Sequence, residues 1–334
     1  MPVKPVQKTG YPESESTELR FELPSATEFT VYIRLQVVIP NPSYPVLFTS
    51  PDQIQFATPS VIRIAPGIRT PCLFQSNLSI ERRLGKGRNY LTVDYTTARS
   101  FRLFRMRNIN APLATTGLRP NPNFINIDQF ESSGGSRGNM LTTTLKTSPH
   151  PRFDLMGQYT YSHTIDDTSA TMFSLPTGNT GGLFSPPADN YDLRGERGRA
   201  NFDRRHQLNL MATYRMPLGF RVGTVVVLNS GIPFNITTGL DNNYDTVAND
   251  RPPGVDRNTG RGPGFAAVDV HLSRSFHPEK NKHRPRIKLG IDAFNVLNNV
   301  NYKNYAGTLT SPFFGRANAA NARRELQLSL QFFF

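Results

Sequence analysis

The residues best suited to chemistry lie in one asparagine-rich stretch. Asp241, Asn243 and Asp245 carry side-chain oxygens at alternate positions. Oxygen ligands at this spacing suit a hard cation, so the sequence predicts a candidate Ca²⁺ site within residues 241–250. An EF-hand is excluded, because the sixth position is threonine instead of glycine and the twelfth is proline instead of glutamate. The alternative is an external loop rich in Asx turns.

The candidates for catalysis are weaker. Asp166 and Asp167 are adjacent carboxylates, and adjacent residues in a loop rarely converge on one bond. His277 and His283 lie in a basic segment without cysteine or carboxylate partners at metal spacing. The Gly-Lys-Gly sequence at 85–87 lacks the Walker spacing and indicates a hairpin, and no GxSxG elbow occurs. We assign no catalytic residue and expect no enzymatic activity.

The composition favours strands over helices. Hydrophobic residues make up 37% of the 334-residue chain, and no apolar run of about eighteen residues occurs, which excludes a transmembrane helix. The 25 glycines, 27 prolines and 23 phenylalanines indicate strands separated by turn-rich loops. The net charge of +13 comes from cations spread along the chain without a nucleic-acid motif. We expect no nucleic-acid partner and a basic face beside anionic lipid, although a basic soluble nucleic-acid-binding β-protein stays as an alternative.

The clearest secondary-structure signal lies at the C-terminus. In residues 325–334 every even position is apolar, and the odd positions are polar except for Phe333. Strict alternation is the period of a β-strand with one face toward an apolar medium. The side chains expected to face lipid are Leu326, Leu328, Leu330, Phe332 and Phe334, and those expected to face the lumen are Gln327 and Ser329.

Similar alternation recurs upstream and predicts about ten strands, each near the nine to eleven residues of a tilted membrane strand. The upstream segments are 29–39, 73–83, 91–95, 153–162, 207–216, 220–228, 268–276 and 286–293. Aromatic side chains near the strand ends are candidates for an interfacial girdle. They are Tyr159, Tyr161, Tyr214, Phe276 and Phe332.

Short and long connectors alternate along the chain. The short ones are 84–88, 148–151, 217–219 and 277–285, and the long ones are 102–138, 164–204, 230–264 and 299–323. Membrane barrels place short turns in the periplasm and long loops outside the cell. The predicted fold is therefore all-β, an antiparallel transmembrane β-barrel segment of about ten strands whose long external loops are the candidate ligand-binding region.

The N-terminal residues differ from the rest. Residues 1–25 are polar and form an uncertain tail, whereas 26–334 show no further domain boundary. Because residues 1–19 lack an apolar h-region, we expect no signal peptide here. The chain is then a fragment, or its start lies inside a longer reading frame.

Several motifs resemble those of TonB-dependent outer-membrane transporters with Oar-like barrels. They are NYDLRGERGRANFDRRH at 190–206, SGIPFNITTG at 230–239, DNNYDTVANDRP at 241–252 and AFNVLNNVN at 293–301, together with the closing strand. The resemblance, which covers roughly residues 107–334, implies a Gram-negative outer-membrane location and about 22 strands in the complete barrel. It also implies a preceding carboxypeptidase-regulatory-like domain and a plug on which the TonB complex acts.

The same resemblance implies that the barrel-assembly machinery recognises the terminal aromatic residues Phe332 and Phe334. The expected function is the barrel portion of a receptor that binds and takes up a ligand in the complete protein. A truncated fragment without independent activity and a small autonomous porin are the alternatives. The ligand cannot be inferred, because selectivity lies in loops and plug.

Overall fold

The computed structural model describes residues 58–85, 87–168, 186–276 and 286–333, together with short strands at 17–19, 32–35, 37–38 and 55–56. These residues form β-strands and two short 3-10 segments, η2 (Leu193–Glu196) and η3 (Pro217–Gly219). None of the helical segments in this part of the chain is long and apolar enough to cross a membrane. The all-β prediction is confirmed.

The chain divides into two compact units. Unit 1 comprises residues 1–68, 106–131 and 243–245, and unit 2 comprises 69–105, 132–242 and 246–334. In unit 1, β1 (Thr17–Leu19), β2 (Tyr32–Leu35) and β5 (Ser60–Ile64) pair in antiparallel fashion, as do β3 (Val37–Val38) and β4 (Gln55–Phe56). β5 also pairs in parallel with the start of β8 (Ile127–His150), a pairing that the alternation pattern did not predict. β1 lies within the predicted tail at 1–25.

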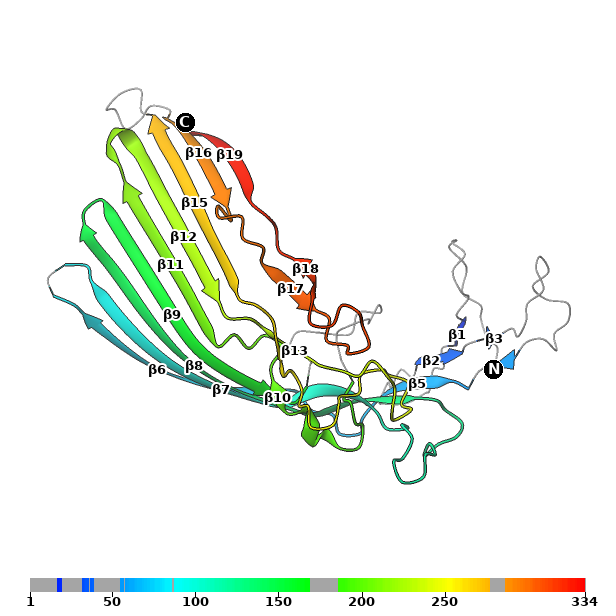
Figure 1. The fold of residues 1–334 in the computed structure, drawn as a ribbon. Helices are drawn as coiled ribbons and strands as arrows, with labels where there is room; N and C mark the ends of the chain where they lie inside the picture. Colours follow the sequence, from blue (N-terminus) through cyan, green and yellow to red (C-terminus); the bar gives the residue numbers. More distant parts are fainter. Residues whose placement is uncertain are drawn as a thin grey trace, which may run out of the picture. The chain divides into compact units, whose positions relative to one another are not determined.

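Unit 2 contains the main sheet, in the order β6-β7-β8-β9-β11-β12-β15-β16-β19 (Figure 1). Neighbouring strands are antiparallel from β8 to β19, and so are β6 and β7. Within the described residues β6 and β19 each pair on one side only, so the sheet is not closed. The long strands are β6 (Cys72–Arg83), β7 (Tyr90–Asn108), β8, β9 (Phe153–Asp166), β11 (His206–Arg215), β12 (Phe220–Asn229), β15 (Phe265–Phe276), β16 (Arg286–Phe294) and β19 (Glu325–Phe333).

Short turns and long loops lie at opposite ends of these strands, as predicted. The hairpin after β6 closes where the Leu84 N–H donates to the Asn89 carbonyl oxygen at 2.8 Å, and Gly85 and Gly87 adopt the positive φ angles of 65° and 123° that this turn requires. Residues 151–152 and 216–219 form the next two turns. The predicted turn at 277–285 lies outside the described residues.

Two predicted loops are shorter than expected. β7 continues to Asn108 and β8 begins at Ile127, so the connector is 109–126 and not 102–138. Polar side chains on the two strands pair with each other there, for example Arg107 with Glu131 at 3.1 Å. Apolar and polar side chains share both faces of these extensions, for example Leu103 beside Arg105 and Phe130 beside Asp128, so no clean alternation reveals the strands. β9 likewise extends to Asp166, beyond the predicted loop start at 164.

Three of the long loops carry short strands of their own. These are β10 (Gly198–Arg199), β13 (Pro233–Phe234), β14 (Gly260–Arg261), β17 (Tyr302–Tyr305) and β18 (Ala317–Ala320).

The strand register separates an apolar outer face from a polar inner face. Leu210 lies opposite Gly157 and Val226, and Leu289 lies opposite Leu330. On the inner face the hydroxyls of Thr142 and Thr160 lie 3.1 Å apart and are buried.

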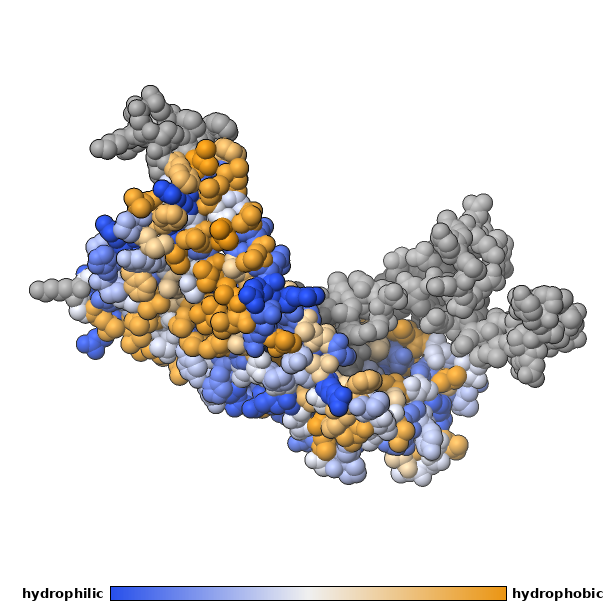
Figure 2. All heavy atoms as spheres, turned by 45° about the horizontal axis from the view of Figure 1, so that its top comes forward, coloured by the Kyte–Doolittle hydropathy of each residue, from blue (hydrophilic) through white to orange (hydrophobic). Residues whose placement is uncertain are grey.

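Outer-face side chains are exposed, up to 79% for Leu328, and hydrophobic residues lie at the surface in Figure 2. Polar burial with apolar exposure is the reverse of a soluble core and matches a strand sheet in lipid.

Aromatic side chains mark both ends of the outer face. Tyr161 of β9 lies at the loop end and Phe153 at the turn end, where it contacts Tyr214 with ring centroids 6.4 Å apart. The eight residue steps between them correspond to roughly 26 Å along the strand, close to the apolar band of about 25 Å in outer-membrane barrels. Of the predicted girdle residues, Tyr159 and Tyr161 lie at the loop end, and Tyr214, Phe276 and Phe332 lie at the turn end.

Candidate functional site

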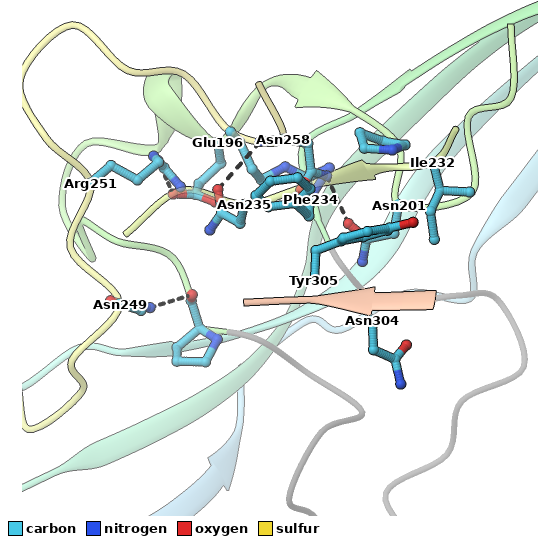
Figure 3. A pocket seen from close by; sticks show the side chains of 13 residues that line it. Glu196, Asn201, Ile232, Phe234, Asn235, Asn249, Arg251, Asn258, Asn304 and Tyr305 are labelled. Carbon is cyan, nitrogen blue, oxygen red and sulfur yellow. Dashed lines mark hydrogen bonds and ion pairs between the residues drawn. The ribbon is translucent and has the colours of Figure 1, made fainter. Parts of the chain in front are cut away.

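Three loops of unit 2 enclose a cavity of about 400 Å³ at the loop end of the sheet (Figure 3). They follow β9, β12 and β16 and correspond to three of the four predicted external loops. The cavity is lined mainly by amide and aromatic side chains, among them Asn201, Phe234, Asn235, Asn249, Asn258 and Tyr305.

An aromatic pair forms one wall of the cavity. The rings of Phe234 and Tyr305 stack at 5.5 Å between centroids with an interplanar angle of 27°. Glycines allow this packing, because a Cβ at Gly260 would overlap the Phe234 ring and one at Gly262 the Tyr305 ring. Burial raises the pKa of the Tyr305 phenol, so its hydroxyl stays a hydrogen-bond donor at neutral pH.

Asparagine amides form the rest of the polar lining. Asn258, at a φ of 58°, donates its Nδ2 to the Arg199 carbonyl oxygen at 2.6 Å and to Asn201 Oδ1 at 2.7 Å. Asn249 donates to the Pro186 carbonyl oxygen at 2.9 Å, while its Oδ1 is buried without a partner in the described part of the chain. The cavity therefore retains an acceptor that a bound donor group can satisfy.

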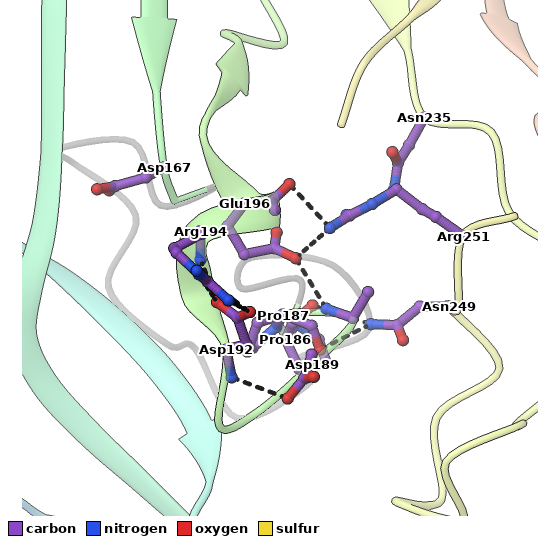
Figure 4. A network of polar contacts seen from close by, with 12 residues as sticks. Asp167, Pro186, Pro187, Asp189, Asp192, Arg194, Glu196, Asn235, Asn249 and Arg251 are labelled. Atoms are coloured by element: carbon purple, nitrogen blue, oxygen red, sulfur yellow. Dashed lines mark hydrogen bonds and ion pairs between the residues drawn. The ribbon is translucent and has the colours of Figure 1, made fainter. Parts of the chain in front are cut away.

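A buried ion pair joins two of the loops. Arg251 donates to Glu196 Oε1 at 2.6 Å, and the two side chains are only 10% and 8% exposed (Figure 4). Glu196 also accepts from the Ala188 N–H at 2.9 Å, and Arg251 also donates to the Gly195 carbonyl oxygen at 3.0 Å. The segment η2 positions Glu196, and a buried pair with these extra hydrogen bonds holds the loops together.

The second arginine of the cavity is also neutralised. Arg257 forms an ion pair with Asp166, and Arg105 forms one with Asp167 at 3.0 Å. Burial first, and then the charge of Arg105, lowers the pKa of Arg257 to about 10, so it stays cationic at neutral pH. The adjacent carboxylates of Asp166 and Asp167 thus each form an ion pair with a different arginine.

The candidate calcium ligands Asp241 and Asn243 accept hydrogen bonds from backbone N–H groups of their own loop, and only the bond to Asn243 has the spacing of an Asx turn. Asp241 Oδ2 accepts from the Thr246 N–H at 2.9 Å, and Asn243 Oδ1 accepts from the Asp245 N–H at 3.0 Å. Asp241 belongs to unit 2, whereas Asn243 and Asp245 belong to unit 1. Within the described ranges no three His, Cys, Asp or Glu side chains are grouped to hold a metal. Calcium binding at 241–250 stays a prediction.

A half-buried carboxyl of unit 1 is expected to make the stability of this unit pH-dependent. Asp128 lies on β8, thirteen residues before Leu141, which pairs with Tyr161 at the membrane edge. Burial, and then the charge of Asp245, raises the pKa of Asp128 from 3.8 to about 6. A raised carboxyl pKa stabilises the folded state fully below the unfolded pKa, and this contribution is lost as the pH rises through the folded value.

We therefore expect β5 and the start of β8 to lose about 2 kcal/mol of local stability between pH 4 and pH 7. Hydrogen exchange of residues 60–64 and 127–131, corrected for intrinsic rates, measures this loss. Asp128→Asn should remove the pH dependence. An unchanged dependence in that variant would assign it to another group.

Of the remaining residues singled out in the sequence, those that the structure describes do not line the cavity. Phe332 lies on the outer face opposite Ile287. His277, His283 and Phe334 lie outside the described residues. The lining asparagines and the Phe234–Tyr305 stack were not predicted as a site, because the stack joins loops separated by about seventy residues in the chain.

Comparison with known families supports the membrane assignment. The model of the family described as outer membrane beta barrel domain matches residues 6–255 and 254–327. No curated protein sequence matches the chain.

Solved structures with a similar fold are outer-membrane transporters and receptors. The transporter YddB from Escherichia coli gives a TM-score of 0.55 at 13% identity, covering 91% of this chain and 38% of that chain. A mutant of the ferric enterobactin receptor PfeA from Pseudomonas aeruginosa, in complex with enterobactin, gives 0.50 at 15% identity, covering 95% and 40%. The chain thus spans about two fifths of the length of these structures. The resemblance to the barrels of TonB-dependent transporters is confirmed at the level of the fold.

Proposed function

Because the chain belongs to the outer membrane beta barrel domain family, we propose that it forms the ligand-binding barrel portion of a TonB-dependent receptor in the Gram-negative outer membrane. In the complete protein the external loops capture a ligand, which then crosses the barrel. We propose no enzymatic activity for it. The observation that carries the proposal is the amide- and aromatic-lined cavity among the long loops, which outer-membrane barrels place outside the cell.

The charges around the cavity favour an uncharged polar ligand. Arg251 is paired with Glu196 and Arg257 with Asp166, so neither arginine offers an uncompensated charge to an anion. Amide groups and a stacked aromatic pair instead suit hydroxyl or amide groups beside an apolar face. We therefore propose that the ligand is a neutral oligosaccharide or peptide, in preference to a ferric chelate of high negative charge.

The proposed partners follow from the two faces and ends of the sheet. Lipid covers the apolar outer face, and the barrel-assembly machinery recognises the closing strand with Phe332 and Phe334. Unpaired backbone groups at β6 and β19 cost several kcal/mol each in lipid, so in the membrane these two edges pair either with each other or with further strands. The TonB complex acts through a plug of the complete protein.

Calcium is the proposed cation of residues 241–250, with Asp241, Asn243 and Asp245 as ligands. If Ca²⁺ binds there, it offsets the repulsion between Asp245 and ionised Asp128. Adding Ca²⁺ at pH 7 should then restore the exchange protection of residues 127–131 in the wild type. Asp245→Asn should abolish this effect, and equal responses in both proteins would count against the site.

Uptake is tested with a fluorophore at the cavity edge. Asn304→Cys in a Cys72→Ser background places a single reactive thiol in this chain, since Cys72 is its only cysteine. Cells carrying the complete protein are titrated with a neutral oligosaccharide, a neutral peptide and ferric enterobactin. We expect a neutral ligand to quench the fluorophore, and the quenching to reverse as energised cells import it.

A proton conductor should keep the fluorescence quenched by blocking import. If the fluorescence recovers equally in the presence of the proton conductor, energy-coupled uptake is contradicted. Quenching by the ferric chelate alone would contradict the neutral ligand class.

A further inference from the structure

One arginine lies among the apolar side chains of the outer face. Arg274 of β15 alternates with Leu272 and Phe276 on this face, opposite Phe220 of β12 and Leu289 of β16. On β9, β11, β12, β15, β16 and β19, the described outer-face positions hold no other arginine or lysine. A cation on a lipid-facing surface requires a polar partner.

Two aromatic rings hold the guanidinium of this arginine. Its central carbon lies 4.7 Å from the ring centroid of Phe220 and 4.6 Å from that of Phe276. Both contacts are within cation–π range. The Nε of Arg274 is buried and has no hydrogen-bond partner within the described ranges, and no described carboxylate forms an ion pair with Arg274. The rings hold the guanidinium in place, and no group in the described part of the chain accepts a hydrogen bond from it.

The position of Arg274 across the membrane indicates which group can accept hydrogen bonds from its guanidinium. Arg274 lies two residues before the end of β15, at the turn end of the sheet, which faces the periplasm. The cost of a lipid-facing arginine is about 2–4 kcal/mol at the midplane and falls to about 0–1 kcal/mol near the interface. Its aliphatic stem follows the apolar surface while the head reaches the polar layer. At this height the available anions are the phosphates of the periplasmic leaflet.

We propose that Arg274, held between Phe220 and Phe276, binds the phosphodiester of a phospholipid in the periplasmic leaflet. The planar fork of guanidinium N–H donors fits two phosphate oxygens. A lipopolysaccharide phosphate is not the ligand, because that lipid occupies the leaflet beside the external loops. The site depends on the membrane location of the sheet and not on the proposed uptake. The lipid-site proposal can therefore fail while the uptake proposal holds, and the reverse.

The test measures which lipid lies beside Arg274 in the full chain. The chain contains no tryptophan, so Leu289→Trp, opposite Arg274 on the outer face, is a single reporter. The protein is inserted into vesicles that mix phosphatidylethanolamine with monogalactosyl diacylglycerol, which lacks phosphate. One lipid at a time carries brominated chains, whose quenching reports its occupancy. We expect about tenfold preference for the phospholipid, lost in Arg274→Gln.

Lys288→Gln is the matched control. Lys288 carries a cation at nearly the same height on the inner face, opposite Ser275 and Gln331, so its loss should leave the preference intact. Arg274→Lys keeps the charge without the planar fork and should show a reduced preference.

The lipid site is overturned if Arg274→Gln keeps the wild-type preference. It is also overturned if inorganic phosphate abolishes that preference, which would indicate a free-anion site. Heat-modifiable migration checks insertion of each variant. Should Arg274→Gln not insert, a wild-type preference in Arg274→Lys would overturn the proposal.

Discussion

Replacing Leu328 by arginine is expected to destabilise the inserted protein by about 2–4 kcal/mol. Leu328 is 79% exposed on the outer face of β19, opposite Ile291 of β16. It lies four residues from Phe332, which marks the periplasmic edge, so the introduced charge lies near the middle of the apolar band. Denaturant titration of the protein folded into lipid vesicles measures the change in the free energy of unfolding.

Gln327→Arg is the control on the adjacent residue. Gln327 lies on the inner face opposite Asp292, whose carboxylate can pair with the new arginine. We expect a change below about 1 kcal/mol, because an inner-face charge stays in a polar environment. Equal losses for both variants would show that the two faces of β19 are wrongly assigned.

Neutralising Glu196 is expected to cost about 3–5 kcal/mol of local stability in the external loops. Glu196→Gln leaves Arg251 as a buried charge without its counter-ion. Glutamine has nearly the same shape as glutamate, so the packing stays the same. Exchange protection and limited proteolysis of residues 186–204 and 249–258 measure the loss. The strands should remain protected, since the pair lies in loops outside the sheet.

Two further variants separate charge from packing. Combining Glu196→Gln with Arg251→Met should recover much of the stability, because replacing a whole buried pair is far less costly than breaking it. Asp192→Asn removes the partner of Arg194 in an exposed ion pair and should change nothing measurable. A Glu196→Gln variant as protected as the wild type would mean that the loops are held by other contacts.

The membrane-spanning strands were predictable because lipid imposes a period of two on their sequence. The alternation from Leu326 to Phe332 predicted correctly which side chains of β19 share one face of the sheet. The alternation in β11 and β16 did the same for those strands. Where the strands leave the membrane this constraint ends. Arg107 and Glu131 pair across β7 and β8 where each face mixes polar and apolar residues, which is why these extensions were predicted as loop.

The loop motifs were noticed for their resemblance, but their physical roles appear only in three dimensions. Asn295 accepts the Asn299 N–H at 3.1 Å, and Asn301 accepts the Ala266 N–H at 2.8 Å, so the motif at 293–301 ties its loop to β15. The motif at 230–239 supplies Phe234 to the cavity. Sequence spacing does not indicate the cavity itself, because its walls come from segments that meet only after folding.

The central claim is that one face of the sheet contacts lipid and the other contacts water. Spin labels placed singly along β11, from Gln207 to Tyr214, in a Cys72→Ser background test it directly in lipid vesicles. Collision with oxygen, which concentrates in lipid, should peak at Leu208, Leu210, Ala212 and Tyr214. Collision with a water-soluble nickel chelate should peak at the residues between them. Peaks of both probes at the same positions, or no period of two, would contradict the membrane sheet.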